Sequence, residues 1–110
     1  MQLPLQITFR DMDPSEAVEQ AIREKANKLE EFNDRITSCH VVIETPHRHH
    51  HKGRVHHIKI HMALPGREVT IDREPERGAH EDIYVAIRDA FDAARRQLRD
   101  LSKKQAEHKG

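Results

Sequence analysis

The sequence predicts an α+β fold in which a four-stranded sheet carries two helices on one face. Four segments alternate apolar and polar residues, which is the period of a strand with one buried face. Two longer segments repeat apolar residues every three or four positions, which is the period of an amphipathic helix. Because each predicted strand has only one apolar face, both helices are expected on the same side of the sheet, and the other face is expected to contact water.

The first strand and the first helix are predicted over residues 3–9 and 14–32. We expect Asp13 to cap the helix, Pro14 to occupy its first position and Glu16 to complete a capping box. The predicted buried stripe of this helix consists of Val18, Ile22, Ala26, Leu29 and Phe32.

The next three strands are predicted to form a meander. Residues 36–44 and 57–64 alternate apolar and polar positions, and Pro65-Gly66 is typical of a tight turn into a fourth strand. The apolar faces of these strands consist of Cys39, Val41, Ile43, Ile58, Ile60, Met62, Leu64, Val69 and Ile71. The charged segment 74–78, which contains a proline and a glycine, ends the meander.

A second, longer helix is predicted to follow Asp82. Its apolar stripe consists of Ile83, Ile87, Ala90, Phe91, Ala94, Leu98 and Leu101. Since 110 residues is the usual size of one domain, we expect residues 1–104 to form a single α+β domain and residues 105–110 to form a short flexible tail.

The composition argues against several classes of protein. The 19 basic and 19 acidic side chains balance, so any surface that binds nucleic acid must be local. No apolar stretch approaches the roughly 20 residues needed to cross a bilayer, so no membrane partner is expected. The N-terminus lacks the pattern of a signal peptide, and the cytoplasm is therefore the expected location.

No catalytic motif is present. The sequence contains no glycine-rich phosphate loop and no Gly-x-Ser-x-Gly elbow. The single cysteine, Cys39, falls on an apolar strand face, and His40 points to the other face, so the pair is poorly placed to act together. We expect no enzymatic activity and no small-molecule substrate.

Basic residues recur on the two predicted helices, on one side of each. They are Lys25 and Lys28 on the first helix, with Arg23 and Arg35 nearby along the chain, and Arg88, Arg95 and Arg99 on the second, a line that Lys103 continues. If the helices lie side by side, these cations form one patch suited to phosphates. The alternative is a solvated helix surface of mixed charge, because Asp92 and other acids lie among them.

Two stretches resemble the ribosome hibernation promoting factor family, also known as ribosome-associated inhibitor or protein Y. "EKANKLEEFNDRI" (24–36) contains the pattern Lys-x-x-Lys-Leu-Glu followed by Asp-Arg-Ile, and "DIYVAIRDAFDAARRQL" (82–98) opens on Asp-Ile-Tyr-x-Ala-Ile and ends on Arg-Gln-Leu. The resemblance extends from the first strand to about Lys104. It implies a β-α-β-β-β-α domain similar to the double-stranded RNA-binding fold. Such a domain binds the small ribosomal subunit near the decoding centre and holds ribosomes inactive under stress or in stationary phase.

The resemblance also implies which residues contact ribosomal RNA. These are Lys25, Lys28, Arg88, Arg95, Arg96 and Arg99. The chain looks like a short member of the family, without the further C-terminal domain of the long members. It departs from the family at Arg88, where an acid is usual, and at Ala93, where a lysine is usual, so individual contacts can differ.

The segment "HRHHHKGRVHH" (47–57) holds six of the ten histidines. It fits a solvated loop with incidental affinity for zinc or nickel, and also a cationic loop that contacts ribosomal RNA or protein through Arg48, Lys52 and Arg54. A physiological metal site is the third interpretation, with His49, His51, His57 and His61 as weak candidates. No cofactor is expected.

Two alternative functions remain open. One is a metal- or pH-responsive cytoplasmic protein that works through its histidine-rich loop. The other is an RNA-binding domain of similar fold that prefers duplex RNA away from the ribosome.

Overall fold

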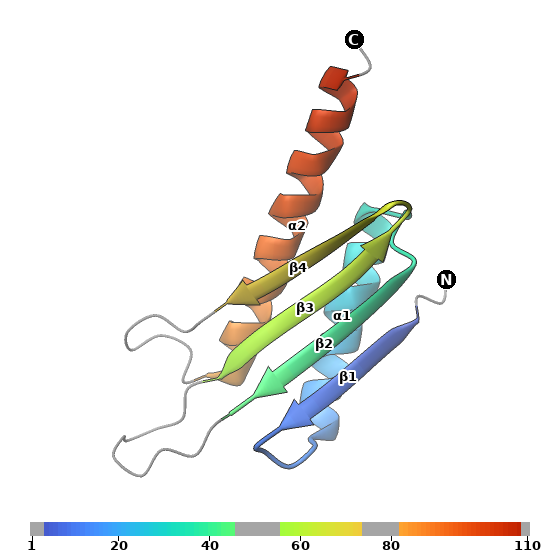
Figure 1. The fold of residues 1–110 in the computed structure, drawn as a ribbon. Coiled ribbons are helices and arrows are strands. Elements are labelled where there is room, and N and C mark those ends of the chain that lie inside the picture. Colours follow the sequence, from blue (N-terminus) through green and yellow to red (C-terminus); the bar gives the residue numbers. More distant parts are fainter. Residues whose placement is uncertain (1–3, 46–55, 74–81, 109–110) are drawn as a thin grey trace.

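The computed structural model describes residues 4–45, 56–73 and 82–108. Its elements follow the order β-α-β-β-β-α, which confirms the predicted fold class (Figure 1). They are β1 (Leu5–Arg10), α1 (Glu16–Phe32), β2 (Ser38–Glu44), β3 (His57–Leu64), β4 (Arg67–Arg73) and α2 (Ile83–His108).

The strands form one sheet in the order β1-β2-β3-β4. β1 pairs parallel to β2, since α1 returns the chain to the end of the sheet from which β1 started. The other pairs are antiparallel, so the predicted meander is confirmed. Gly66 makes the turn between β3 and β4 with φ of 71°, a left-handed conformation that glycine adopts without steric cost.

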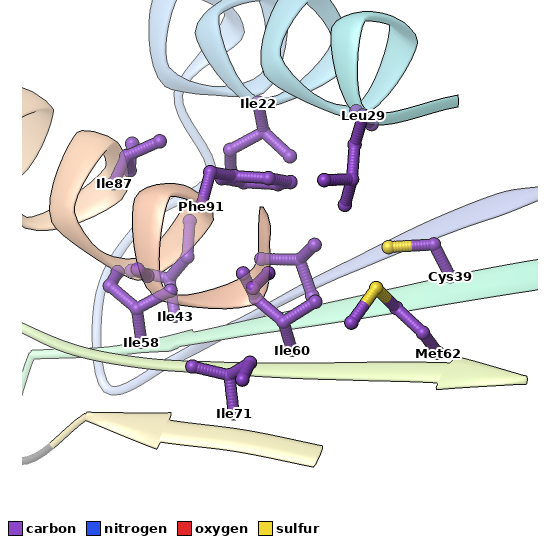
Figure 2. Close-up of a cluster of buried hydrophobic side chains, with 14 of the residues drawn as sticks. Ile22, Leu29, Cys39, Ile43, Ile58, Ile60, Met62, Ile71, Ile87 and Phe91 are labelled. Carbon is purple, nitrogen blue, oxygen red and sulfur yellow. The ribbon is translucent and has the colours of Figure 1, made fainter. Parts of the chain in front are cut away.

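Both helices cover the same face of the sheet, and the core lies between these two layers (Figures 1 and 2). Figure 2 shows the strand side chains pointing toward the helices, where Ile22, Leu29, Ile87 and Phe91 meet them. The three apolar side chains of β1, by contrast, are only partly buried.

The start of α1 differs from the predicted cap. Ser15 is the N-cap: its backbone is extended, and its Oγ accepts a hydrogen bond from the Val18 backbone N–H at 3.3 Å. The predicted roles of Asp13, Pro14 and Glu16 as cap, first helical residue and capping-box acid were therefore wrong. The helix begins two residues later than the sequence suggested because the serine hydroxyl reaches the third helical N–H.

The end of α1 also differs from the expectation, because Phe32 is not buried. Its relative exposure is 40%, whereas Leu29 is 4% exposed. Three residues correspond to about 300° around a helix, so Phe32 lies about 60° to one side of Leu29. The aromatic ring therefore lies on the flank of α1 rather than over the sheet.

α2 begins after Asp82, as predicted. The Asp82 Oδ1 atom accepts hydrogen bonds from the backbone N–H groups of Tyr84 and Val85, at 2.9 and 3.4 Å. The helix continues to His108, so residues 105–108, which we expected in a tail, extend it. Glycine and proline are absent from this stretch, and nothing in its sequence ends a helix. In the part of the chain that the structure describes, neither helix is long and apolar enough to cross a membrane.

Candidate nucleic-acid interface

The two helices lie side by side, and one contact establishes which flanks face each other. The guanidinium carbon of Arg95 on α2 is 4.8 Å from the centre of the Phe32 ring on α1. The helices run in the same direction (Figure 1). Lys25 and Arg88 each lie seven residues before this contact, which is about two turns and returns to nearly the same side of each helix. The fold thus places Lys25 and Arg88 along the line where α1 and α2 meet, which we call the seam.

Two further predicted cations belong to this seam. At about 100° per residue, Lys28 lies about 40° from Phe32 around α1, and Arg99 lies about 40° from Arg95 around α2. The residues that we name the helical cationic face are Lys25, Lys28, Arg88, Arg95 and Arg99. Arg96 is exposed but lies about 100° around α2 from Arg95, on the side of the helix that faces away from the sheet.

Most cations of this face have no acidic partner among the residues that the structure describes. Within residues 4–45, 56–73 and 82–108, no ion pair is recorded for Lys25, Lys28, Arg95 or Arg99. The exception is Arg88, which is 3.3 Å from a carboxylate oxygen of Asp89. Unpaired cations held on two rigid helices are suited to bind the phosphates of a nucleic acid.

For comparison, Arg23, a cation on the other flank of α1, forms an ion pair with an acidic side chain. The Arg23 guanidinium is 3.4 Å from a carboxylate oxygen of Glu19, one turn earlier. By the same count of about 100° per residue, Arg23 lies on the side of α1 away from Phe32. The structure therefore distinguishes the unpaired cations of the seam from a paired cation elsewhere.

Two aromatic side chains at the seam were not among the predicted site residues. Phe32 was expected in the core, and Tyr84 was not considered as a site residue. Both are exposed, by 40% and 47%. Tyr84 lies outside the apolar stripe of α2, on the same flank as Arg88 and Arg95, and this offset was the signal in the sequence that could have identified it.

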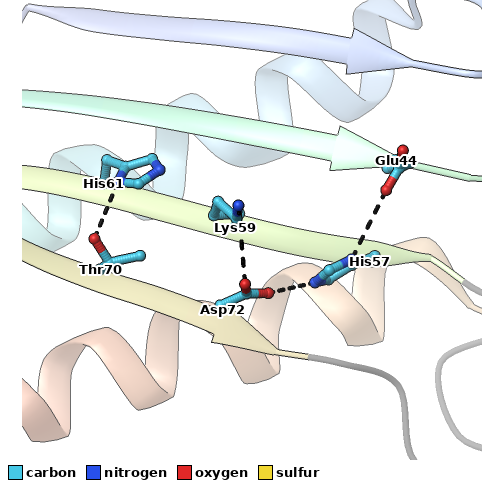
Figure 3. A network of polar contacts seen from close by, with 6 residues as sticks. All are labelled: Glu44, His57, Lys59, His61, Thr70 and Asp72. Atoms are coloured by element: carbon cyan, nitrogen blue, oxygen red, sulfur yellow. Dashed lines mark hydrogen bonds and ion pairs between the residues drawn. The ribbon is translucent and has the colours of Figure 1, made fainter.

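The face of the sheet opposite the helices carries a polar network (Figure 3). His57 Nε2 is within hydrogen-bonding distance of Asp72 Oδ1, and His57 Nδ1 is 3.9 Å from a Glu44 carboxylate oxygen. Lys59 Nζ is 3.9 Å from the other oxygen of Asp72. These cross-strand pairs join β2, β3 and β4 on the exposed side of the sheet.

Two further histidines lie on this open face. His40 Nε2 is 2.8 Å from the Thr8 hydroxyl, and His61 Nδ1 is 3.0 Å from the Thr70 hydroxyl. The two imidazole centres are 6.4 Å apart. His40, His57 and His61 thus share the open face, and each ring has a partner on a neighbouring strand.

The described residues hold no group of three or more histidine, cysteine, aspartate or glutamate side chains arranged to bind a metal ion. Of the weak metal candidates, His57 and His61 have the partners given above. His49 and His51 lie outside the described residues, as do the predicted loop contacts Arg48, Lys52 and Arg54.

The environment of Cys39 does not favour nucleophilic chemistry. The side chain is 2% exposed, and burial raises the pKa of its thiol to about 11. The reactive thiolate is therefore scarce at neutral pH, as expected for a structural cysteine.

Comparisons with known proteins place this fold in a family. The model of the family described as Sigma 54 modulation protein / S30EA ribosomal protein matches residues 5–106. A protein of Azotobacter vinelandii named ribosome hibernation promoting factor is 31% identical over 105 residues, which cover 96% of this chain and 88% of that protein. The ribosome hibernation promotion factor of Deinococcus radiodurans is 26% identical over 94 residues, which cover 86% of this chain. The chain spans only 46% of the Deinococcus protein.

Solved structures show the same fold. A ribosomal subunit interface protein from Coxiella burnetii superposes with a TM-score of 0.70 at 18% identity, covering 94% of this chain and 99% of that one. The N-terminal domain of Thermus thermophilus Protein Y superposes with a TM-score of 0.63 at 20% identity, covering 92% of this chain and 99% of that one. The family predicted from the two helix motifs is confirmed: this chain belongs to the Sigma 54 modulation protein / S30EA ribosomal protein family.

Proposed function

We propose that this chain binds the small ribosomal subunit through its helical cationic face and holds ribosomes inactive, without catalysis. Its family and the names of its relatives support a role in ribosome hibernation. The structural observation that carries the proposal is the row of cations on the seam between α1 and α2, most of which have no acidic partner among the described residues.

The finer parts of the proposal follow from the resemblance of the two helix motifs. The chain binds ribosomal RNA near the decoding centre, where it excludes messenger and transfer RNA under stress or in stationary phase. Its place of action is the cytoplasm. Arg96 is a further candidate for a phosphate contact, on the side of α2 that faces away from the sheet.

The geometry explains how a chain with no net charge binds a polyanion. The acids and bases balance over the whole molecule, but the seam concentrates cations on two adjacent helices. Each phosphate contact releases counterions, so the logarithm of the affinity falls with the logarithm of the salt concentration by about 0.7–0.9 per contact. Removal of three contacts therefore lowers this slope by about 2 to 3.

Co-sedimentation with isolated small subunits over a salt series tests the proposal. The variant Lys25→Ala/Lys28→Ala/Arg99→Ala removes three cations of the seam and keeps the Arg95–Phe32 contact. The control Arg10→Ala/Arg23→Ala/Lys59→Ala removes the same charge from the open sheet face and the far flank of α1. We expect the seam variant to bind more weakly with a reduced salt slope, and the control to bind like the wild type.

Equal losses in the two variants would show that total charge, rather than the seam, determines binding, and would contradict the proposal. Binding that disappears with a chelator would instead favour the metal-responsive alternative. Free duplex RNA should compete poorly; strong competition would favour a duplex-binding protein.

A further inference from the structure

The two large apolar side chains that are exposed in the described part of the chain both lie on the seam between the helices. Phe32 is 40% exposed and Tyr84 is 47% exposed. Single exposed apolar residues are ordinary in proteins, so exposure alone carries little information. What distinguishes this pair is its position beside the helical cationic face.

Phe32 already takes part in a cation–π contact. The Arg95 guanidinium lies 4.8 Å from the centre of its ring, and no acidic partner for Arg95 is recorded among the described residues. A guanidinium plane and an aromatic ring both accept a nucleobase face to face. An unpaired base can therefore stack beside this contact, with Lys28 one turn earlier on the same side of α1.

Tyr84, at the start of α2, offers a second ring on which a base can stack. Hydrogen bonds from the backbone N–H groups of Tyr84 and Val85 to Asp82 Oδ1 hold the first turn of the helix, so the attachment point of the tyrosine ring is well defined. Arg95 follows eleven residues later, which is about 16 Å along the helix axis. Along this axis, Lys25 and Arg88 lie between the position of Tyr84 and that of the Arg95–Phe32 contact.

The arrangement favours RNA with unpaired bases over the other occupants. A protein partner would need an acidic side chain opposite each cation, whereas every nucleotide of an RNA strand carries a phosphate. Duplex RNA would satisfy the cations, but its base faces are stacked inside the helix and cannot reach the rings. A strand with unpaired bases satisfies both features.

We propose that Phe32, which contacts Arg95, and Tyr84 each stack on an unpaired base, which makes the helical cationic face selective for unpaired RNA. This inference rests on the proposed function, because it names the form of RNA that the same face recognises. The cations contribute affinity for any strand, and the two rings supply the preference for exposed bases.

Tyr84 provides its own probe, because the chain contains one tyrosine and no tryptophan. The full chain is titrated with a short oligoadenylate and with an RNA duplex of the same length, while tyrosine emission and the anisotropy of labelled RNA are recorded. We expect oligoadenylate to bind more tightly than duplex and to quench the tyrosine, whereas duplex at matched absorbance does not. Tighter binding of duplex would overturn the inference.

The variant Phe32→Leu/Tyr84→Leu removes both rings but keeps apolar side chains and all cations. We expect its affinity for oligoadenylate to fall by about tenfold or more, since stacking contributes substantially for each base. Its affinity for duplex should not change. The conservative variant Phe32→Tyr/Tyr84→Phe keeps two rings and should bind oligoadenylate like the wild type.

Failure of this inference is distinct from failure of the proposed function. If the ring variant binds oligoadenylate as tightly as the wild type, stacking is excluded, while the subunit binding of the seam variant still decides the proposed function. If the ring variant loses subunit binding but keeps its affinity for oligoadenylate, a ribosomal protein contacts the rings and the inference is wrong. If the seam variant binds subunits normally, the proposed function fails.

Discussion

Cys39 is a residue whose behaviour follows directly from its burial. Its side chain lies between the sheet and the helices, and burial raises the pKa of its thiol to about 11 from an ordinary value of 9.0 (Figure 2). The folded state therefore keeps its proton at pH values where the unfolded state loses it. Stability from this group is complete below about pH 9 and is lost as the pH rises toward 11.

Two measurements test this prediction for Cys39. A thiol reagent at neutral pH should modify the unfolded protein but not the native one. Between pH 9 and 11, the free energy of unfolding of the wild type should fall by about 2 kcal/mol more than that of Cys39→Ala. Parallel curves for the two proteins would show that the thiol does not titrate differently in the folded and unfolded states.

Ile60 and His61 are neighbours in β3 that point to opposite faces of the sheet. Ile60 is fully buried in the core, whereas His61 is exposed on the open face. Ile60→Ala should lower the free energy of unfolding by about 2–5 kcal/mol, because it removes buried methyl groups and leaves a cavity. His61→Ala should change it by about 0.5 kcal/mol or less. Urea unfolding of both variants checks the difference, and similar losses would contradict the assigned faces of β3.

At the scale of an element, the start of α1 offers a test between the predicted cap and the observed one. Ser15→Ala removes the hydroxyl that accepts the Val18 N–H and should lower the free energy of unfolding by about 1 kcal/mol. Asp13→Ala is the matched control and should have little effect. Thermal or urea unfolding distinguishes the two, and a larger loss from Asp13→Ala would favour the cap predicted from the sequence.

The same element shows why the predicted buried stripe of α1 was almost right. The periodicity of Val18, Ile22, Ala26 and Leu29 identified the side that packs on the sheet, and all four are buried. Phe32 continues the spacing but drifts to the flank of the helix, where α2 supplies a partner in Arg95. The identity of that partner depends on the packing of two helices whose sequences are far apart.

At the scale of the whole molecule, the two faces of the protein carry different chemistry. The helical face gathers cations, most of them without an acidic partner in the described part of the chain, and exposed rings, whereas the open sheet face carries His40, His57 and His61 among acids and hydroxyls. Because the formal net charge is zero at pH 7 and the chain holds ten histidines, mild acid makes the molecule cationic. His57 and His61 lie on the face of the sheet opposite the helices (Figure 3).

This separation predicts how binding changes with pH. Affinity for oligoadenylate should rise as the pH is lowered from neutral to about 6, because protonated histidines add positive charge to the whole molecule. The rise should be similar in the wild type and in Lys25→Ala/Lys28→Ala/Arg99→Ala, since the histidines that the structure describes on the sheet lie on the face away from these cations. Anisotropy at constant ionic strength measures both. An increase confined to the wild type would show that the histidines act through the helical face.

The order of elements, the shared apolar faces and the family were predictable from the sequence, because the periods of two and 3.6 residues and the two helix motifs are local properties of the chain. The positions of Lys25, Lys28, Arg88, Arg95 and Arg99 on their helices were predictable for the same reason. Their convergence on one seam, the exposure of Phe32 beside Arg95 and the pairing of His57 with Asp72 depended on the tertiary structure. These features arise from contacts between segments distant in sequence, and a local pattern does not specify which flanks such segments turn toward each other.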